Sequence, residues 1–262
     1  MKKSGKCALL TGASAGIGQE LARLLASDGH RVFLVARRRD RLEALAKDLT
    51  ATYGVEVAVL AEDLADPAAP ARIVDQVRAA GAEIDFLVNN AGFGSLGSFA
   101  EAERDGELRM VDVNVRALLE LTHRCLPSML ARRQGRILNI ASVAGFVPGP
   151  FMATYYASKA FVLSFTEALA TELRGTGVTA TAVCPGPTTT EFAQVAKSER
   201  TNLFQRGVAD AASVARHGYR AMLAGKVVAI PGWKNKLSAF LPRIAPRPLV
   251  RVAVAWMNSK RT

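Results

Sequence analysis

A glycine-rich turn near the N-terminus constrains the fold of this chain more than any other feature. Residues 6–10 form an apolar, strand-like run, residues 11–18 read Thr-Gly-Ala-Ser-Ala-Gly-Ile-Gly, and an amphipathic helical pattern follows. A strand, a glycine turn and the start of a helix in this order are typical of a dinucleotide-binding site. We expect Gly12 to permit the tight turn, Gly16 to let a pyrophosphate approach the backbone, and Gly18 to let the helix pack closely on the strand. Free N–H groups at the start of the helix would face the phosphates.

The rest of the chain alternates strand-like and helix-like segments, which predicts an α/β fold. Further strands are expected at residues 32–36, 55–60, 84–89, 136–141, 179–184 and 226–230. Most of these runs are continuously apolar, as strands covered on both faces are. Strands separated by helices imply right-handed crossovers and a doubly wound parallel sheet of the Rossmann type. A chain of 262 residues that is 50% hydrophobic can bury such a sheet as a single domain, and no linker or repeat divides it.

Tyr155 and Lys159 lie one helical turn apart, at the start of an apolar, helix-periodic run that continues to Leu173. Residues four apart on a helix share a face, so the phenol and the ammonium can meet at one site. A free tyrosine ionises at about pH 10, and a nearby cation lowers the pKa of the phenol because it favours the phenolate. The pair is therefore a candidate for general acid–base chemistry on a carbonyl or an alcohol.

These motifs occur together in an order that resembles the short-chain dehydrogenase/reductase family, from about residue 6 to residue 231. The resemblance rests on the glycine turn, with three residues and then one residue between its glycines, and on Asn89-Asn90-Ala91-Gly92, Asn114, Ser142, Tyr155, Lys159 and Pro185-Gly186. It implies an oxidoreductase that transfers hydride between a nicotinamide cofactor and a carbonyl or alcohol. It also implies a homodimer or a homotetramer.

The resemblance assigns catalytic roles to four residues. Tyr155 would exchange a proton with the substrate oxygen, and Ser142 would hold that oxygen through its hydroxyl. Lys159 would tune Tyr155 and bind the nicotinamide ribose, and Asn114 would help to hold a water that links Lys159 to solvent. Taken singly, Ser142 could simply cap a turn and Asn114 could be an ordinary helix residue. The neighbouring Tyr156 lacks a lysine four residues later, so we expect it to serve packing or substrate contact.

The same resemblance implies contacts to the cofactor along the whole predicted site. The candidate residues are Gly12, Ser14, Gly16, Ile17 and Gly18 in the turn, Arg37 after the second strand, Asp63 and Leu64 after the third, Asn90 and Gly92 after the fourth, Pro185, Gly186, Thr188 and Thr190 after the sixth, and Tyr155 and Lys159. Asp63 and Leu64 would meet the adenine, and Thr190 the nicotinamide carboxamide.

The residues after the second strand favour NADP(H) over NAD(H). An NAD enzyme places an acidic residue there for the ribose 2′-hydroxyl, whereas a cation suits a 2′-phosphate. The chain has Ala36 followed by three arginines, with no carboxylate before Asp40. Arg37 is the candidate selector, because a planar guanidinium suits phosphate recognition. The alternative is that these arginines merely begin a solvated helix.

The expected substrate pocket is apolar. By resemblance it would be bounded by residues 93–99, residues 143–152 and the segment after Pro185, and neither of the first two ranges contains a charged residue. The candidate substrate contacts are Phe93, Ser142, Phe146 and Tyr155. This lining predicts a hydrophobic ketone or alcohol, such as a 3-oxoacyl group, a sterol-like ketone or an aromatic ketone. A catalytically idle NADP-binding regulator and a membrane-surface lipid-binding protein on the same fold are the alternatives.

The C-terminal residues differ from the rest in charge. The net charge is +11, and after Asp210 the chain contains ten Lys and Arg and no Asp or Glu. We expect residues 1–231 to form the NADP-binding and catalytic domain and residues 232–262 to form a basic, apolar extension. A basic, apolar segment with an aromatic residue can lie on an anionic membrane. Three prolines divide it, however, and its apolar residues could instead cover the pocket or a subunit interface.

The remaining features predict a cytoplasmic enzyme without a metal. The three cysteines fit reduced, buried thiols, and the three histidines are scattered without metal-ligand spacing. No signal peptide fits the N-terminus, and no apolar run approaches the length of a membrane span. We therefore expect a hydrophobic small-molecule substrate, no nucleic-acid partner, and at most a peripheral membrane contact through the basic extension.

Overall fold

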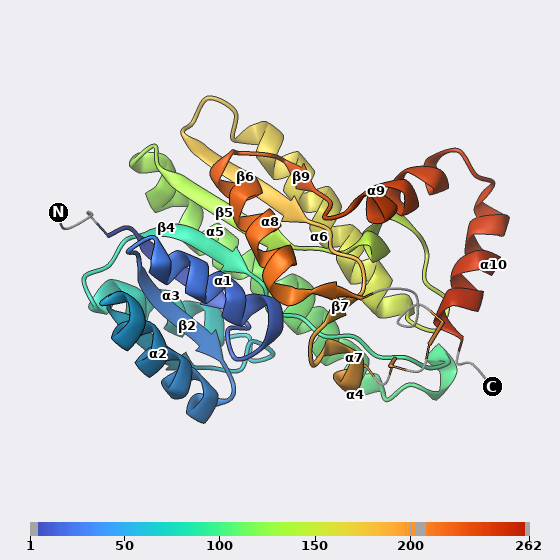
Figure 1. The fold of residues 1–262 in the computed structure, drawn as a ribbon, viewed down its shortest axis with the longest axis horizontal. Helices are drawn as coiled ribbons and strands as arrows, with labels where there is room; N and C mark the ends of the chain where they lie inside the picture. Colours follow the sequence, from blue (N-terminus) through green and yellow to red (C-terminus); the bar gives the residue numbers. More distant parts are fainter. Residues whose placement is uncertain (1–4, 197, 200, 203–207, 260–262) are drawn as a thin grey trace.

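The computed structural model describes residues 5–196, 198, 199, 201, 202 and 208–259, and its centre is a seven-stranded parallel sheet (Figure 1). The sheet order is β3-β2-β1-β4-β5-β6-β9. The strands are β1 (Cys7–Thr11), β2 (Arg31–Ala36), β3 (Val57–Ala61), β4 (Ile84–Asn89), β5 (Gly135–Ile140), β6 (Val178–Val183) and β9 (Val228–Ala229). All seven predicted strands are therefore present within about two residues of their expected bounds.

Helices cover both faces of the sheet because successive strand residues point to opposite sides. Leu10 of β1 joins an apolar cluster with α1 (Gly16–Ser27), α2 (Arg39–Tyr53) and α8 (Ala211–Leu223). Its neighbour Leu9 joins the cluster on the other face, with α3 (Ala69–Ala79), α5 (Ala117–Ala131) and α6 (Ala153–Glu172). Burial on both faces explains the continuous apolar runs, and the doubly wound Rossmann-type fold is confirmed.

The strand order reverses between β1 and β4, which places a crevice at the carboxyl ends of these strands. The chain proceeds outward from β1 to β2 and β3, and then returns to β4 before it continues to β5 and β6 on the other side. Ligands of open α/β sheets bind in the crevice at such a reversal. The glycine turn follows β1 and residues 90–93 follow β4, so both border this crevice.

Short elements frame the same end of the sheet. They are η1 (Phe99–Glu101), α4 (Arg104–Val111), a π-helical turn η2 (Asp112–Arg116), a 3₁₀ turn η3 (Val143–Phe146), α7 (Phe192–Val195) and the paired short strands β7 (Thr188–Thr189) and β8 (Ala209–Asp210).

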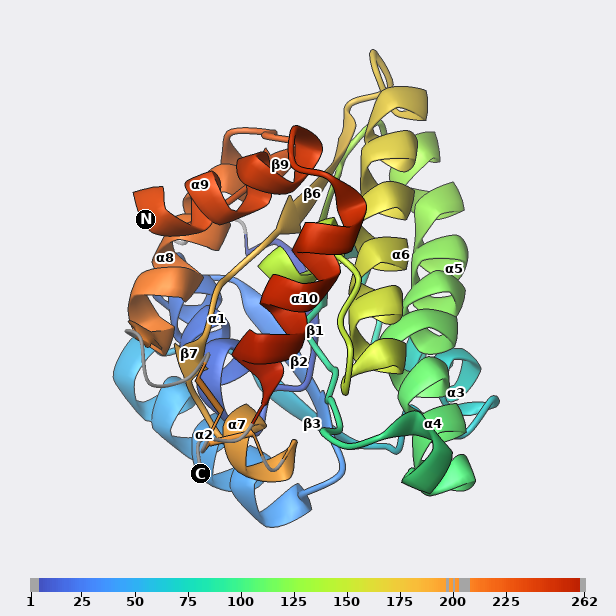
Figure 2. The same cartoon turned by 90° about the vertical axis from the view of Figure 1, so that its right-hand side faces the viewer.

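The C-terminal extension folds into helices α9 (Trp233–Phe240), η4 (Leu241–Arg243) and α10 (Arg247–Asn258). Pro242 and Pro248 stand at the starts of η4 and α10, so the prolines divide the extension as expected. Figure 2 shows α10 lying across the end of the molecule that carries the crevice, in front of the sheet. None of the described helices is long and apolar enough to cross a bilayer.

Candidate active site

A cavity of about 790 Å³ begins at the glycine turn and runs beneath the C-terminal helices. Its walls contain nearly all of the cofactor and catalytic candidates from the sequence. These are Gly12, Ser14, Gly16, Ile17, Arg37, Asp63, Leu64, Asn90, Gly92, Phe93, Ser142, Tyr155, Lys159, Pro185, Gly186, Thr188 and Thr190. Gly18, Asn114 and Phe146 are the three candidates that are not part of its lining.

The geometry of the glycine turn explains all three of its glycines. Gly12 has φ +68°, a conformation that residues with a Cβ rarely adopt, and a Cβ there would lie 2.7 Å from the Asn90 amide nitrogen. A Cβ on Gly18 would lie 2.2 Å from the Gly12 carbonyl oxygen, so Gly18 sits behind the turn where α1 meets β1. Thr190 packs over Gly16, whose Cβ would lie 2.7 Å from the threonine methyl.

Asn90 holds the turn in this shape. Its side-chain amide donates hydrogen bonds to the carbonyl oxygens of Thr11 and Gly12, both at 3.0 Å. The Thr11 hydroxyl in turn accepts from the backbone N–H groups of Asn90 and Ala91, at 3.0 and 3.1 Å. These contacts tie the end of β1 to the segment after β4 and leave the backbone of the turn facing the cavity.

Two arginines border the cavity after β2. Arg37, the predicted selector, is exposed and lines the cavity, and Ala36 beside it offers no carboxylate. Arg38 was not identified from the sequence. Its guanidinium donates to the Ser14 hydroxyl at 3.0 and 3.3 Å and pairs with the Glu191 carboxylate at 2.8 Å. A guanidinium directed at the glycine turn is consistent with phosphate recognition there.

Glu191 joins the two halves of the crevice by ion pairs. Its carboxylate binds Arg41 and Arg38, and these two cations hold the pKa of Glu191 below its ordinary value. On the far side of the cavity, the Asp63 carboxylate accepts from Arg109 of α4 and from the Ala65 N–H. Each carboxylate is therefore paired with an arginine that also lines the cavity, Glu191 with Arg38 and Asp63 with Arg109.

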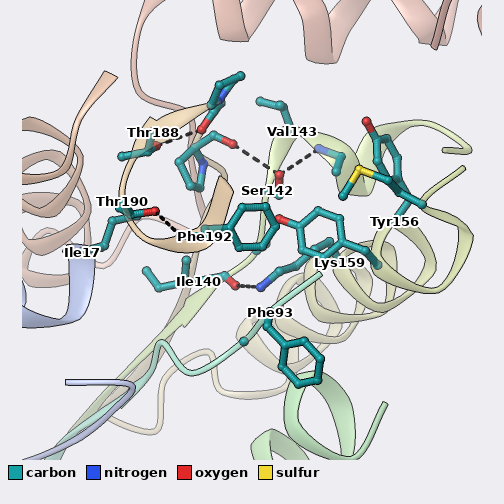
Figure 3. Close-up of a pocket in the computed structure, with 18 of the residues that line it drawn as sticks. Ile17, Phe93, Ile140, Ser142, Val143, Tyr156, Lys159, Thr188, Thr190 and Phe192 are labelled. Carbon is teal, nitrogen blue, oxygen red and sulfur yellow. Dashed lines mark hydrogen bonds between the residues drawn. The ribbon is translucent and has the colours of Figure 1, made fainter. Parts of the chain in front are cut away.

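Ser142, Tyr155 and Lys159 all line the cavity, and Figure 3 shows Ser142 and Lys159 among its lining residues. Ser142 follows β5 and caps η3, where its hydroxyl oxygen accepts from the Ala144 N–H at 3.1 Å. Lys159 is buried, and its Nζ donates to the Ile140 carbonyl oxygen at 2.7 Å. The same Nζ lies 5.9 Å from the centre of the Tyr155 ring. Ser142 therefore caps a turn, as the alternative interpretation expected, and it also lines the cavity.

Asn114 lies behind this group in the π-helical turn η2. Its side-chain oxygen accepts from the Phe93 N–H at 3.1 Å, and its amide donates to the Phe93 carbonyl and to the Ser158 hydroxyl at 2.9 and 3.0 Å. A Cβ on Gly92 would lie 3.1 Å from the Asn114 oxygen and 3.3 Å from Lys159 Nζ. Asn114 is therefore not an ordinary surface-facing helix residue. It fixes the segment after β4 next to Lys159.

The expected lowering of the Tyr155 pKa is not found. Burial raises the pKa of Tyr155, and a hydrogen bond with Ser142 only partly offsets this effect. Burial also lowers the pKa of Lys159 to about 8, since the charged ammonium loses its hydration. The reason for the difference is that the sequence shows the proximity of the cation but not the desolvation of both groups. Tyr155 is consequently a protonated phenol at neutral pH.

Two aromatic residues near the site, Phe146 and Tyr156, are held by packing contacts. Phe146 is half-buried, packs on a core cluster that contains Leu118, Val162 and Leu163, and is not part of the cavity lining, so its contact with substrate stays a prediction. Tyr156 packs edge-on against Tyr155, and its hydroxyl donates to the Asn258 side-chain oxygen at 3.1 Å. Tyr156 thus packs in a core cluster, and because it also lines the cavity, the alternative of substrate contact stays a prediction.

The C-terminal extension provides a wall of the cavity that the sequence did not predict in detail. Its lining residues include Leu249, Val250, Ala253, Val254 and Met257 of α10. A hydrogen bond from the Asn258 amide to the Pro150 carbonyl, at 2.9 Å, fastens the end of α10 beside η3. The apolar residues of the extension were expected to cover either the pocket or a subunit interface. One face of α10 lines the cavity, so α10 covers the pocket.

Comparison with known proteins identifies the family. The model of the short chain dehydrogenase family matches residues 6–201, and the chain belongs to this family. A very-long-chain 3-oxoacyl-CoA reductase of Anas platyrhynchos is 36% identical over 201 residues, which cover 74% of this chain and 63% of the relative. Sulfoacetaldehyde reductase 2 of Chromohalobacter salexigens is 40% identical over 192 residues, which cover 71% and 74%. The chain thus spans less than two thirds of the length of the first of these relatives.

Solved structures agree with the family assignment. A short-chain dehydrogenase from Sphingobium yanoikuyae in complex with NADPH has a TM-score of 0.81 and 35% identity, covering 87% of this chain and 88% of that one. A short chain dehydrogenase/reductase from Burkholderia phymatum in complex with NAD has a TM-score of 0.82 and 27% identity, covering 91% and 93%. The fold follows from this similarity, and the two solved structures hold different nicotinamide cofactors.

Proposed function

We propose that this protein is an NADP(H)-dependent oxidoreductase that interconverts the carbonyl and alcohol forms of a hydrophobic substrate. One observation carries the proposal. A single cavity joins a glycine turn flanked by arginines, the Ser142–Tyr155–Lys159 group, and an apolar wall formed by α10. The first part suits a phosphorylated dinucleotide, the second suits proton exchange with an oxygen, and the third suits an apolar substrate.

The residues present fit the cofactor. The cradle at Gly12 and Gly16 has no room for a side chain, as close approach of a pyrophosphate requires. Arg37 and Arg38 would bind the 2′-phosphate. Bound NADPH would supply the hydride. The proposed contacts elsewhere are Ser14, Ile17 and Gly18 around the turn, Asp63 and Leu64 at the adenine, Asn90 and Gly92 at the ribose and phosphates, and Pro185, Gly186, Thr188 and Thr190 toward the nicotinamide.

Tyr155 acts as the proton donor in the reductive direction. A free tyrosine already holds its proton at neutral pH and burial raises the pKa of Tyr155 further, so the phenol is protonated and can give its proton to a carbonyl oxygen as negative charge develops there. Ser142 holds that oxygen through its hydroxyl. Lys159, with a pKa of about 8, is partly able to release a proton near neutrality and can help to restore the phenol. Asn114 positions the Phe93 backbone and holds the water that links Lys159 to solvent.

The substrate is a hydrophobic ketone or alcohol, such as a 3-oxoacyl, sterol-like or aromatic ketone. The support is the lining beyond Tyr155, where Val143, Val147 and Met152 face Val250 and Val254 of α10. The substrates named for the two relatives, a very-long-chain 3-oxoacyl-CoA and sulfoacetaldehyde, differ widely. The apolar wall favours an apolar substrate, such as the acyl chain of a 3-oxoacyl compound, over a small, charged one such as sulfoacetaldehyde.

The organisation that we propose has two parts. Residues 1–231 form the cofactor-binding and catalytic domain, and residues 232–262 form an extension that completes the substrate pocket. The three cysteines are free and buried, which suits a cytoplasmic protein. We also propose assembly into a homodimer or a homotetramer, as the family resemblance implies.

Consumption of NADPH with a panel of ketones tests the proposal. We expect turnover with long-chain 3-oxoacyl, steroid or aryl ketones, and much slower turnover with NADH or with sulfoacetaldehyde. The competing assignment is a catalytically idle NADP-binding regulator. Tight NADPH binding would favour that assignment and overturn ours if the protein neither reduced any ketone of the panel nor oxidised any of the matching alcohols.

A further inference from the structure

Helix α9 has its apolar residues on the outside. Trp233, Leu237 and Phe240 recur at helical spacing and form one stripe, yet Trp233 is 70% and Phe240 is 54% exposed. The polar Asn235 and Ser238 instead line the cavity. An amphipathic helix on a soluble surface normally has the opposite orientation. The stripe therefore contributes little to packing within the chain.

Helix α10 extends this apolar surface. Its inner residues Val250, Val254 and Met257 pack against the cluster beside Tyr155. On its outer side Val252 is 69% and Trp256 is 49% exposed. Both views place α9 and α10 together at one end of the molecule, at the surface (Figures 1 and 2). Both helices thus carry exposed apolar residues, and Ile244 in the connection between them is 70% exposed. The exposed residues of α9, α10 and this connection are here called the C-terminal face.

The charge on the C-terminal face has one sign. Lys234, Lys236, Arg243, Arg247 and Arg251 are exposed, and among the described residues none of them forms an ion pair with a carboxylate. The sequence explains this, because no Asp or Glu follows Asp210. Elsewhere in the described structure many arginines are paired with carboxylates. Exposed apolar and aromatic side chains flanked only by cations are typical of segments that lie on anionic lipid surfaces.

The C-terminal face also borders the mouth of the cavity. Leu241 and Leu249 line the cavity and are nevertheless 47% and 64% exposed, so they form part of its rim. Arg243 and Arg247 lie in the connection between these two leucines. The entrance of the cavity therefore lies next to the C-terminal face, and a ligand that enters there would come from the surface on which this face docks.

We propose that the C-terminal face docks on an anionic lipid bilayer and opens the cavity toward the lipid. The substrate is then a membrane-resident ketone or alcohol, a point that rests on the proposed function. The docking itself does not depend on catalysis. A second copy of this chain fits the same face poorly, since a symmetric contact would bring like charges together. An acidic soluble protein would match the charge but would not account for the outward Trp233, Phe240 and Val252.

Tryptophan fluorescence gives a direct test because both tryptophans of the chain, Trp233 and Trp256, lie on the C-terminal face. We expect the emission to shift to shorter wavelength on addition of phosphatidylglycerol–phosphatidylcholine vesicles, and the protein to sediment with them. Vesicles of phosphatidylcholine alone and high salt should reduce both effects. The Trp256→Phe variant should retain the shift, since Trp233 remains as reporter.

Charge reversal separates docking from general electrostatics. Arg243→Glu/Arg251→Glu should weaken vesicle binding at least about twentyfold, because each nearby cation contributes about fivefold. Lys47→Glu/Arg174→Glu changes the net charge equally at exposed positions outside the C-terminal face and should bind vesicles nearly as the parent does. Equal weakening by both pairs would overturn the assignment of the surface.

The apolar contribution is tested by Trp233→Ser/Phe240→Ser. This variant should lose vesicle binding but keep turnover of a water-soluble ketone, because neither side chain lines the cavity. Intact protein that remains in the supernatant with anionic vesicles at low salt would overturn the proposal. In that case, a change of oligomeric state in the same variant would assign the face to a second copy. Vesicle binding without any ketone turnover would instead retain the docking and reject the proposed function.

Discussion

The pH dependence of folding stability tests the burial of Lys159. Burial lowers the pKa of this lysine from 10.5 to about 8, so the unfolded chain binds the proton more tightly than the folded protein does. The difference corresponds to about 3 kcal/mol at 1.36 kcal/mol for each pH unit. Below about pH 8 the lysine is charged in both states, and the folded state bears the full cost. Between about pH 8 and 10.5 the folded state loses the proton first, so stability rises with pH.

Lys159→Met removes this contribution. We expect the free energy of unfolding of the parent protein, relative to the variant, to increase by about 3 kcal/mol between pH 7 and pH 10.5. Urea unfolding of the nucleotide-free proteins at a series of pH values measures the difference, and comparison of two proteins cancels the titration of other groups. Lys47→Met, at an exposed position of α2, is the matched control and should show no such trend. A flat difference for Lys159→Met would refute the burial argument and, with it, the proton supply assigned to this lysine.

Three further substitutions test the cofactor end of the cavity. Arg37→Asp should shift the preference between NADPH and NADH toward NADH by at least about tenfold, since one charge-assisted contact is worth about 1.5–3 kcal/mol, and titration of both cofactors measures it. Glu191→Gln should tighten NADPH binding up to about fivefold without changing NADH binding, because it releases the part-exposed guanidinium of Arg38. Gly18→Ala should cost about 1–3 kcal/mol in thermal or urea unfolding, because its Cβ would meet the Gly12 carbonyl at 2.2 Å. An unchanged cofactor preference in Arg37→Asp would count against Arg37 as the selector. Equal effects of Glu191→Gln on both cofactors would count against a role of Arg38 at the 2′-phosphate. Unaltered stability of Gly18→Ala would count against the close packing at Gly18.

Local patterns predicted the sheet and the phosphate-binding turn. The continuous apolar runs coincide with strands because both faces of the sheet are covered, and the positive φ of Gly12 is a property of a single residue. The spacing of Tyr155 and Lys159 placed both on one face of α6. These features depend on a few neighbouring residues, which is why the sequence is sufficient to predict them.

Features that depend on distant parts of the chain were missed or were wrong. The pKa of Tyr155 is set by burial, which the sequence does not show. Arg37 and Arg38 both line the cavity, and only the fold shows that the Arg38 guanidinium reaches Ser14 of the glycine turn. Likewise, only the fold shows that Val147 and not its neighbour Phe146 lines the cavity. The wall formed by α10 brings together residues about 100 positions apart, as the Tyr156–Asn258 hydrogen bond shows. Composition indicated the basic, apolar extension, but not that α9 turns its apolar stripe outward.

Turnover of Tyr155→Phe compared with Tyr156→Phe tests the central assignment most directly. Tyr155→Phe removes only the hydroxyl, so we expect NADPH to bind normally while ketone reduction falls by about 10²–10⁴-fold or more. Tyr156→Phe removes a hydrogen bond to Asn258 and should retain most of the turnover, with a small loss of stability. The account predicts this pattern in single-turnover experiments with saturating NADPH. Near-normal turnover of Tyr155→Phe, together with loss of turnover in Tyr156→Phe, would contradict it.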